Sequence, residues 1–192
     1  MKAKKVFRRK VPFYKKKEFM TYLVGLFIIV IMATSALSMW GGDEEGVEFD
    51  GMKFVDSGYG WQTYIGESKV TISSYPLDLE NVSIDDVSFS SLNLMGKLYF
   101  SINPYDSYQQ AVYDFQANID LFPNVVYSCY EDNDLCSDMP LKDCDDAMDG
   151  TGVVIFRETN SSDFVEFSGN CLVIEGKDLL KVTDKLILDY YG

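Results

Sequence analysis

The segment from residue 19 to residue 40 contains no charged side chain, and it constrains the chain more than any other feature. It reads FMTYLVGLFIIVIMATSALSMW, a run of 22 residues. A helix rises about 1.5 Å per residue, so this segment would reach roughly 33 Å and cross a hydrocarbon layer of about 30 Å. Tyr22 and Trp40 stand near its ends, where aromatic side chains suit the membrane interfaces. The segment therefore predicts a transmembrane helix.

Charge divides the rest of the chain around this segment. Residues 1–18 carry nine Lys and Arg and one Glu, a net charge of +8. Residues 43–192 carry the other eight bases and 29 acids, a net charge of −21, which brings the whole chain to −13. The positive-inside rule places the basic leader, residues 1–18, in the cytoplasm. Residues 41–46 then form a Gly/acid linker, and 47–192 form an acidic extracytoplasmic domain.

A cleaved secretory signal is the alternative interpretation of the same segment. Leu23 to Met32 resembles the apolar region of a signal, and Ala33 to Ala36 offers small residues for a peptidase. The mature protein would then be secreted and begin near Leu37. We favour an uncleaved signal-anchor, because the 18-residue leader and the apolar run are both long for a signal. The expected localisation is the cell membrane, with a single-pass helix in contact with lipid.

The exterior part has enough residues for one α+β domain. We expect a mostly antiparallel sheet, with a hairpin of 153–157 and 164–167 around a turn at 158–163, and two amphipathic helices. The first helix should open at Asn103-Pro104 and end before Pro123, and the second should open at Lys177. Strand-like patterns occupy 47–50, 52–55, 59–65, 69–72, 97–102, 125–129, 153–157, 164–167 and 171–175.

The four cysteines permit two disulfides in three connectivities, which fits an exported domain. We favour the sequential pairing of Cys129 with Cys136 and of Cys144 with Cys171, and the other two connectivities stay open. A zinc site of four thiolates is the alternative. Its spacing lacks the C-x2-C pairs of such sites, and no C-x-x-C redox motif is present.

Several classes of catalytic and metal site are excluded by composition. The chain has no histidine, so imidazole bases and His-ligated metals are absent, and it has neither a G-x-S-x-G nor an S-x-x-K nucleophile motif. The acidic loop, residues 130–152, is rich in Asp and raises the question of calcium, but Cys136 or Ala147 stands where a calcium loop needs its third ligand. We therefore assign no catalytic, cofactor or metal residues.

Two glycosylation acceptor sequences and the acidic charge give expectations about the surface of the domain. Asn160 and Asn81 begin N-x-S glycosylation acceptor sequences, and Asn160 is the better candidate because it falls in a predicted turn. The acidic domain should repel nucleic acid.

A glycosidase needs only a pair of carboxylates, ideally beside a wall of aromatic side chains. The candidate aromatic residues are Trp61, Tyr64, Tyr127 and Tyr130. The 29 acidic residues do not single out one pair of carboxylates.

Short motifs are spread over nearly the whole chain, at 33–35, 75–82, 99–104, 144–147, 153–158, 170–176 and 184–186. Together they resemble a family of small uncharacterised archaeal single-pass membrane proteins. The resemblance implies an archaeal cell envelope, a pairing of Cys144 with Cys171, and no known function, while Cys129 and Cys136 are additions to the family pattern.

The expected function is therefore that of a binding or assembly module of the cell envelope. The exterior domain would associate with another envelope protein, and its net charge of −21 favours a basic partner surface. The alternative is a carboxylate-dependent, glycosidase-like envelope hydrolase. An enzyme is the less favoured of the two.

Overall fold

The structure, a computed structural model, describes residues 17–40, 46–85, 87–119, 124–148 and 150–192. Most of the basic leader (1–16), most of the linker (41–45), Pro123 and Asp149 lie outside these ranges. The chain divides into two units, Met1–Glu44 and Glu45–Gly192, which we describe separately.

The first unit contains one long helix, α1, Lys17–Trp40. Its apolar side chains are largely exposed, for example Tyr22 at 79% and Met32 at 68%. Among the residues that the structure describes, no helix has the length and apolar character needed to cross a membrane.

The second unit begins with a four-stranded antiparallel sheet in the order β1-β2-β3-β4. Its strands are β1 (Val47–Phe49), β2 (Met52–Asp56), β3 (Trp61–Ile65) and β4 (Ser68–Ile72). Asp50 and Gly51, with φ of 50° and 73°, turn β1 into β2 as a two-residue hairpin requires. Alternation along the strands buries Phe54, Thr63 and Val70 on the inner face.

A second, five-stranded sheet has the order β6-β5-β7-β9-β8. β5 pairs in parallel with β6 and β7, β7 pairs in parallel with β9, and only β8 and β9 are antiparallel. The α+β class is confirmed. The expected antiparallel pairing holds for the first sheet, but the second sheet is mostly parallel, and the expectation of a single sheet is wrong. The strands are β5 (Lys97–Ile102), β6 (Val125–Cys129), β7 (Thr151–Glu158), β8 (Phe164–Ser168) and β9 (Cys171–Gly176).

The expected hairpin of β7 and β8 is also wrong. β9 lies between these two strands, and the hairpin is formed by β8 and β9, which turn at Gly169 with a φ of 60°. The reason is burial. Leu172 and Ile174 bury one face of β9 in the core, and Val173 and Glu175 on the other face are half-buried, whereas β8 alternates between exposed and buried residues as an edge strand does.

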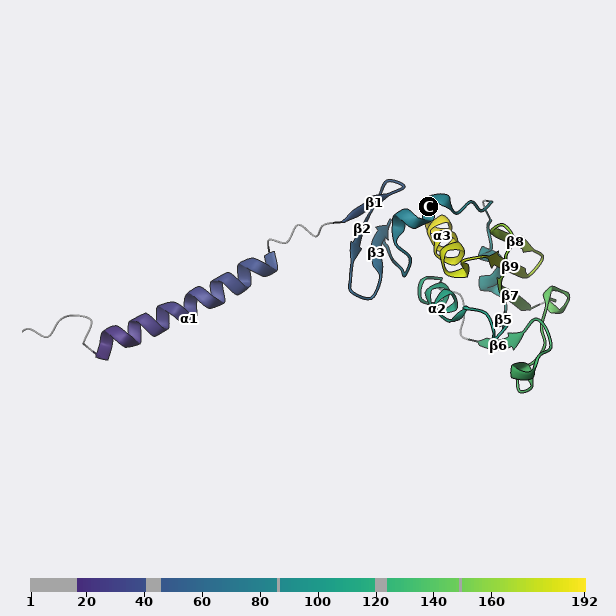
Figure 1. Ribbon diagram of the computed structural model, residues 1–192, viewed down its shortest axis with the longest axis horizontal. Helices are drawn as coiled ribbons and strands as arrows, with labels where there is room; N and C mark the ends of the chain where they lie inside the picture. The colour runs from purple at the N-terminus through teal and green to yellow at the C-terminus, as the bar shows by residue number, and fades with distance from the viewer. Residues whose placement is uncertain (1–16, 41–45, 86, 120–123, 149) are drawn as a thin grey trace, which may run out of the picture. The chain divides into compact units, whose positions relative to one another are not determined.

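Two helices, α2 (Gln109–Asn118) and α3 (Leu179–Tyr191), lie between the two sheets (Figure 1). Phe115 of α2 and Val182 of α3 belong to one hydrophobic core together with residues of both sheets. Short 3-10 helices complete the unit: η2 (Pro76–Asn81), η3 (Ser90–Leu94), η4 (Asp134–Cys136) and η5 (Cys144–Asp146).

The first helix does not open at Asn103-Pro104 as the sequence suggested. Asn103 instead starts a turn, in which its Oδ1 accepts from Tyr105 N and its carbonyl accepts from Asp106 N. The helix begins six residues later, at Gln109. The side chain of Asp106 bonds to groups outside the helix, as described below, and this holds residues 103–108 in a loop.

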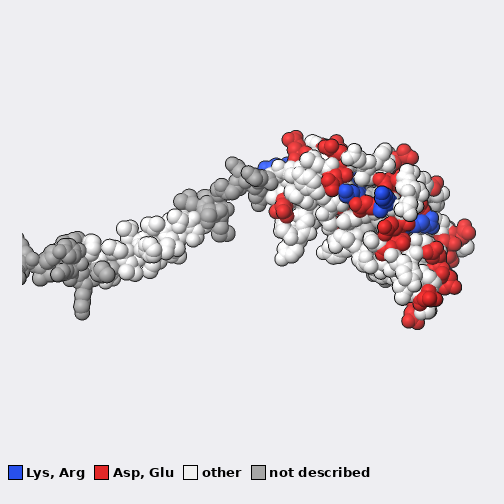
Figure 2. Space-filling view, viewed as in Figure 1, with Lys and Arg blue, Asp and Glu red and all other residues white. Residues whose placement is uncertain are grey.

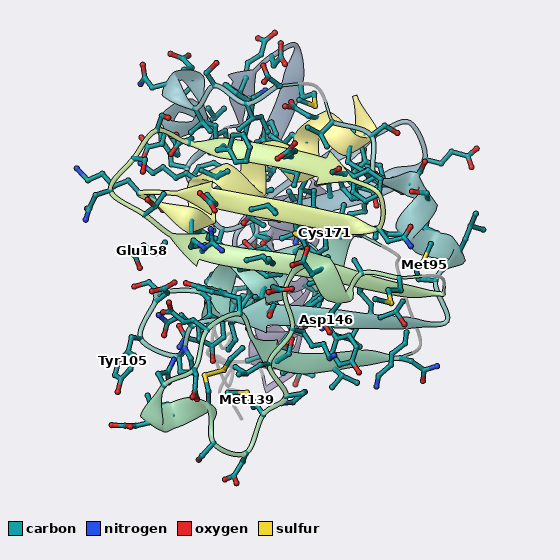
Figure 3. All side chains as sticks on the ribbon, turned by 90° about the vertical axis from the view of Figure 1, so that its right-hand side faces the viewer. Met95, Tyr105, Met139, Asp146, Glu158 and Cys171 are labelled. Carbon is teal, nitrogen blue, oxygen red and sulfur yellow. A yellow bond between two sulfur atoms is a disulfide. The ribbon has the colours of Figure 1, made fainter. Side chains whose placement is uncertain are left out.

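The sheet face opposite the helices is covered in part by residues 130–148. This segment packs on a smaller apolar cluster of Val153, Ile155 and Cys171, with Tyr99 and Tyr130 against it. Figure 3 looks onto this face. The segment that carries Met139 and Asp146 crosses in front of the lower strands, and the upper strands are open to the viewer.

Candidate functional site

A groove lies where α2 and α3 begin. Its volume is about 800 Å³. The carboxyl ends of β7 and β9 reach the same place, because Glu158 is the last residue of β7 and Lys177 follows β9. We call it the carboxyl-end groove. Its lining is Val82, Ser107, Gln109, Gln110, Glu158, Asp163, Lys177, Asp178, Leu179, Leu180 and Lys181.

A hydrogen-bond network fixes the loop between β5 and α2 at this edge. Asp106 Oδ2 accepts from the Tyr130 hydroxyl at 3.0 Å and from the backbone N–H of Glu158 at 3.1 Å. The Glu158 carboxylate in turn accepts from Ser107 N at 2.9 Å. Asn103 donates to Glu131 at 2.6 Å. The ends of β5, β6 and β7 are thereby tied together beside the groove, near the labelled Glu158 and Tyr105 in Figure 3.

Tyr130 acts in this network as a hydrogen-bond donor. Burial raises the pKa of its phenol, and the hydrogen bond to Asp106 raises it further. Arg157 lies over the Tyr130 ring, with its guanidinium carbon 4.7 Å from the ring centre. Tyr130 therefore stays protonated over the physiological pH range and cannot serve as a base there.

The groove carries charges of both signs. Glu158, Asp163 and Asp178 provide three carboxylates, and Lys177 and Lys181 provide two ammonium groups. Lys181 is held by Asp78 at 3.0 Å and lies 3.8 Å from Asp178. Lys177 is exposed and, within the described residues, has no ion-pair partner.

Two of the three carboxylates are engaged by backbone amides. Glu158 accepts from Ser107 N, and Asp178 caps α3 by accepting from Lys181 N at 3.4 Å. No aromatic residue is among those lining the groove in the described part of the chain. The groove is thus equipped to bind a polar ligand, and it lacks the aromatic wall that a sugar-cleaving site was expected to have.

The structure contains both disulfides of the favoured sequential pairing. Cys129 is joined to Cys136, with Cα atoms 6.1 Å apart, and Cys144 is joined to Cys171, with Cα atoms 5.3 Å apart. The second bond attaches η5 to the first residue of β9. Because all four sulfurs are in disulfides, the zinc alternative is ruled out, and the bonds indicate an oxidising compartment such as the outside of the cell.

The two glycosylation candidates lie on the surface. Asn160 is exposed in the connection that follows β7, and Asn81 is exposed at the last residue of η2. The sequence interpretation favoured Asn160 because Asn81 was expected near a packed segment. Pro76 and Leu79 of η2 are indeed buried, yet the Asn81 side chain is exposed.

The acidic loop does not assemble a metal site within the described residues. No group of three or more Cys, Asp or Glu side chains there is arranged to hold an ion, and Asp149 lies outside these residues. Asp146 instead pairs with Lys142 at 2.7 Å, a contact that lowers the pKa of its carboxyl group. Asp143 and Asp146 form a capping box at the start of η5.

The four candidate sugar-stacking aromatics are scattered over the domain. Trp61 packs edge-on against Tyr75, with ring centres 5.2 Å apart. Tyr64 is 70% exposed on β3, and Tyr127 is 43% exposed on β6. Tyr130 lies under Arg157. They do not form a shared wall.

Sequence interpretation missed the buried polar side chains of the two helices, namely Asp114, Asn118 and Asp184. They are 3%, 7% and 0% exposed. A signal was present, because Asp114 and Asn118 follow Ala111 at the spacing of three and seven that defines one face of a helix. A helix face that is defined by its apolar residues alone leaves out polar residues at the same spacing.

The chain matches no family of proteins, no curated protein and no solved structure. The resemblance to archaeal single-pass membrane proteins therefore stays a prediction.

Proposed function

We propose that the domain of residues 47–192 is a binding module, and that the carboxyl-end groove is where it takes a polar ligand of mixed charge. The observation that carries this proposal is which charged groups of the groove already have a partner and which do not. Glu158 and Asp178 are engaged by backbone amides, whereas Lys177 is unpaired among the described residues. An unpaired, exposed cation beside fixed carboxylates suits recognition better than proton transfer.

The first turns of α2 and α3 support the same function. Both helices begin at the groove, and the N-terminal N–H groups of a helix favour negative charge. Lys177 adds positive charge at this place, and Val82, Leu179 and Leu180 add an apolar surface. A segment of an envelope protein with a carboxylate near apolar side chains is complementary to this combination.

The experiment compares Lys177→Glu with Lys69→Glu in the full chain. Lys69 is exposed on β4, away from the groove lining, so the two variants carry the same change in net charge. A panel of envelope peptides and glycans is tested for binding by the purified protein. We expect Lys177→Glu alone to weaken binding by about tenfold or more, or about 1.4 kcal/mol. Equal binding by both variants would show that the carboxyl-end groove is not the binding site.

The same panel tests the hydrolase alternative. Turnover of any panel member that disappears in Glu158→Gln, while the variant keeps the melting temperature of the wild type, would replace the binding module with a carboxylate-dependent hydrolase. Asp163→Asn serves as the second variant, because Asp163 is the carboxylate of the groove for which no bond to a backbone amide is described above.

We further propose that residues 19–40 anchor the protein in the cell membrane, with the leader inside and the binding domain outside. No helix of the described residues has the length and apolar character needed to cross a membrane, so the support for this proposal is the sequence pattern: 22 uncharged residues that follow a basic leader. The protein should stay in the membrane fraction after an alkaline carbonate wash, and external protease should remove the domain from intact cells. A soluble mature form beginning near Leu37 would contradict the anchor.

A further inference from the structure

A second surface lies on the sheet face opposite the helices, away from the carboxyl-end groove. Register places Arg157, Glu175 and Phe164 side by side in one row, and Ile155, Val173 and Glu166 in the next. Residues 143–145 of the η5 segment form one side of this surface. We call it the sheet-face groove; its volume is about 350 Å³.

The floor of the sheet-face groove is apolar and only partly covered. Ile155 is buried, but Val173 is half-buried and Phe164 is 44% exposed. The covering segment stops at η5, which leaves β8 and the neighbouring part of β9 open, as the upper strands in Figure 3 show. The disulfide from Cys144 to Cys171 attaches η5, at one side of this surface, to the first residue of β9.

The charges around this floor are almost all negative. The lining contains four carboxylates, Asp143, Asp145, Glu166 and Glu175, and one cation, Arg157. Arg157 already has partners for its charge, because it donates to Glu175 at 2.5 Å and lies over the Tyr130 ring. Asp145 and Glu166 are exposed carboxylates with no ion pair among the described residues. Figure 2 shows acidic side chains spread over this end of the domain, with few Lys and Arg among them.

We propose that the sheet-face groove docks a basic segment of a partner protein. Lys and Arg side chains fit it because their aliphatic stems can cover Phe164 and Val173 while their charged ends reach Asp145 and Glu166. The charge complementarity also speeds encounter at low salt. This surface shares no residue with the carboxyl-end groove, so the two proposals stand or fall separately.

The test measures binding of a synthetic (Lys-Ser)5 peptide to the full-length protein in detergent micelles. The groove variant is Asp145→Lys with Glu166→Lys. The matched control is Asp132→Lys with Asp138→Lys, two exposed acids that do not line the groove, so both double variants change the net charge equally. We expect the groove variant to weaken binding by at least about tenfold, which is about 1.4 kcal/mol, and the control by less than about threefold.

A third variant and two further peptides complete the design. Phe164→Ser should weaken binding without a change of charge, which tests the apolar floor. A (Glu-Ser)5 peptide should not bind. Equal losses in both double variants would overturn the proposal in favour of a diffuse electrostatic effect. Tighter binding of a peptide of residues 1–18 than of (Lys-Ser)5 would overturn a foreign partner in favour of the chain's own leader.

Discussion

Asp114 of α2 and Asp184 of α3 accept hydrogen bonds from two consecutive backbone amides, Ser73 N at 2.9 Å and Ser74 N at 2.8 Å. Residues 73 and 74 directly follow β4, which is an edge strand of the first sheet. An edge strand leaves backbone groups unpaired, and here side chains from the helices supply the partners. The two carboxyl groups therefore join the first sheet to the helices that cover the second.

We predict that this junction makes the stability of the domain depend on pH. Burial raises the pKa of Asp184 well above 3.8, and the neighbouring Asp114 raises it further. The folded domain keeps a proton that the unfolded chain releases above about pH 4, so this contribution is full at low pH and is lost as the pH rises through the raised pKa. Asp184→Asn keeps an acceptor for Ser74 N and cannot ionise.

The check is urea unfolding of wild type and Asp184→Asn at a series of pH values from 4 upward. The difference in unfolding free energy should move steadily in favour of the variant as the pH rises. Asp189→Asn on the same helix is the control; it removes a surface ion pair with Lys185 at 2.7 Å but no buried carboxyl group. A difference that does not change with pH would show that Asp184 is ionised in the folded domain.

Asn118 should be the most sensitive hydrogen-bonding side chain of α2. Its amide accepts from Thr71 N at 2.8 Å and donates to the carbonyls of Thr71 and Asp114 at 2.6 and 2.7 Å, as a neighbouring strand would. Asn118→Ala should lower the unfolding free energy by about 2–3 kcal/mol, because three bonds of about 1 kcal/mol are lost. Gln116→Ala, exposed on the same helix, should cost less than about 0.5 kcal/mol. Similar losses in both variants would contradict the edge-pairing role.

The two disulfides should differ in their effect on stability. Cys144 and Cys171 are 27 residues apart, and the chain-entropy relation gives a stabilisation of about 3.6 kcal/mol for this loop. Cys129 and Cys136 are 7 residues apart, for which the same relation gives about 2.5 kcal/mol. Paired Cys→Ser variants in denaturant unfolding should show this order. Non-reducing peptide mapping that recovered Cys129 joined to Cys171 would reject the pairing itself.

Gly176 should tolerate no larger residue. A Cβ atom there would lie 2.4 Å from Val182 Cγ2, and Val182 is fully buried in the core. Gly176→Ala should therefore destabilise the domain by about 1–3 kcal/mol, as overpacking does. At Gly96 the same added atom would meet its nearest neighbour at 3.6 Å, an ordinary contact, so Gly96→Ala is the control. A melting temperature of Gly176→Ala equal to that of this control would contradict the close packing.

Local patterns in the sequence were enough to place most of the strands. β5 and β6 occupy the predicted 97–102 and 125–129, because alternating apolar residues bounded by turn residues depend only on near neighbours. The sequential disulfides also agree with the structure. The start of α2 was misplaced, because the bonds that hold residues 103–108 in a loop come from Tyr130 and Glu158, far along the chain.

Tertiary structure alone decided how the strands are ordered and where the grooves lie. β9 separates β7 from β8 because it pairs with both of them, and no local pattern distinguishes such a strand from one that closes the sheet. The carboxyl-end groove and the sheet-face groove each combine residues from distant elements. Asp184 is of a residue type that is usually exposed, yet the fold buries it completely. Pairing, burial and proximity between distant residues are properties of the folded chain, whereas strand and helix propensity are properties of the sequence itself.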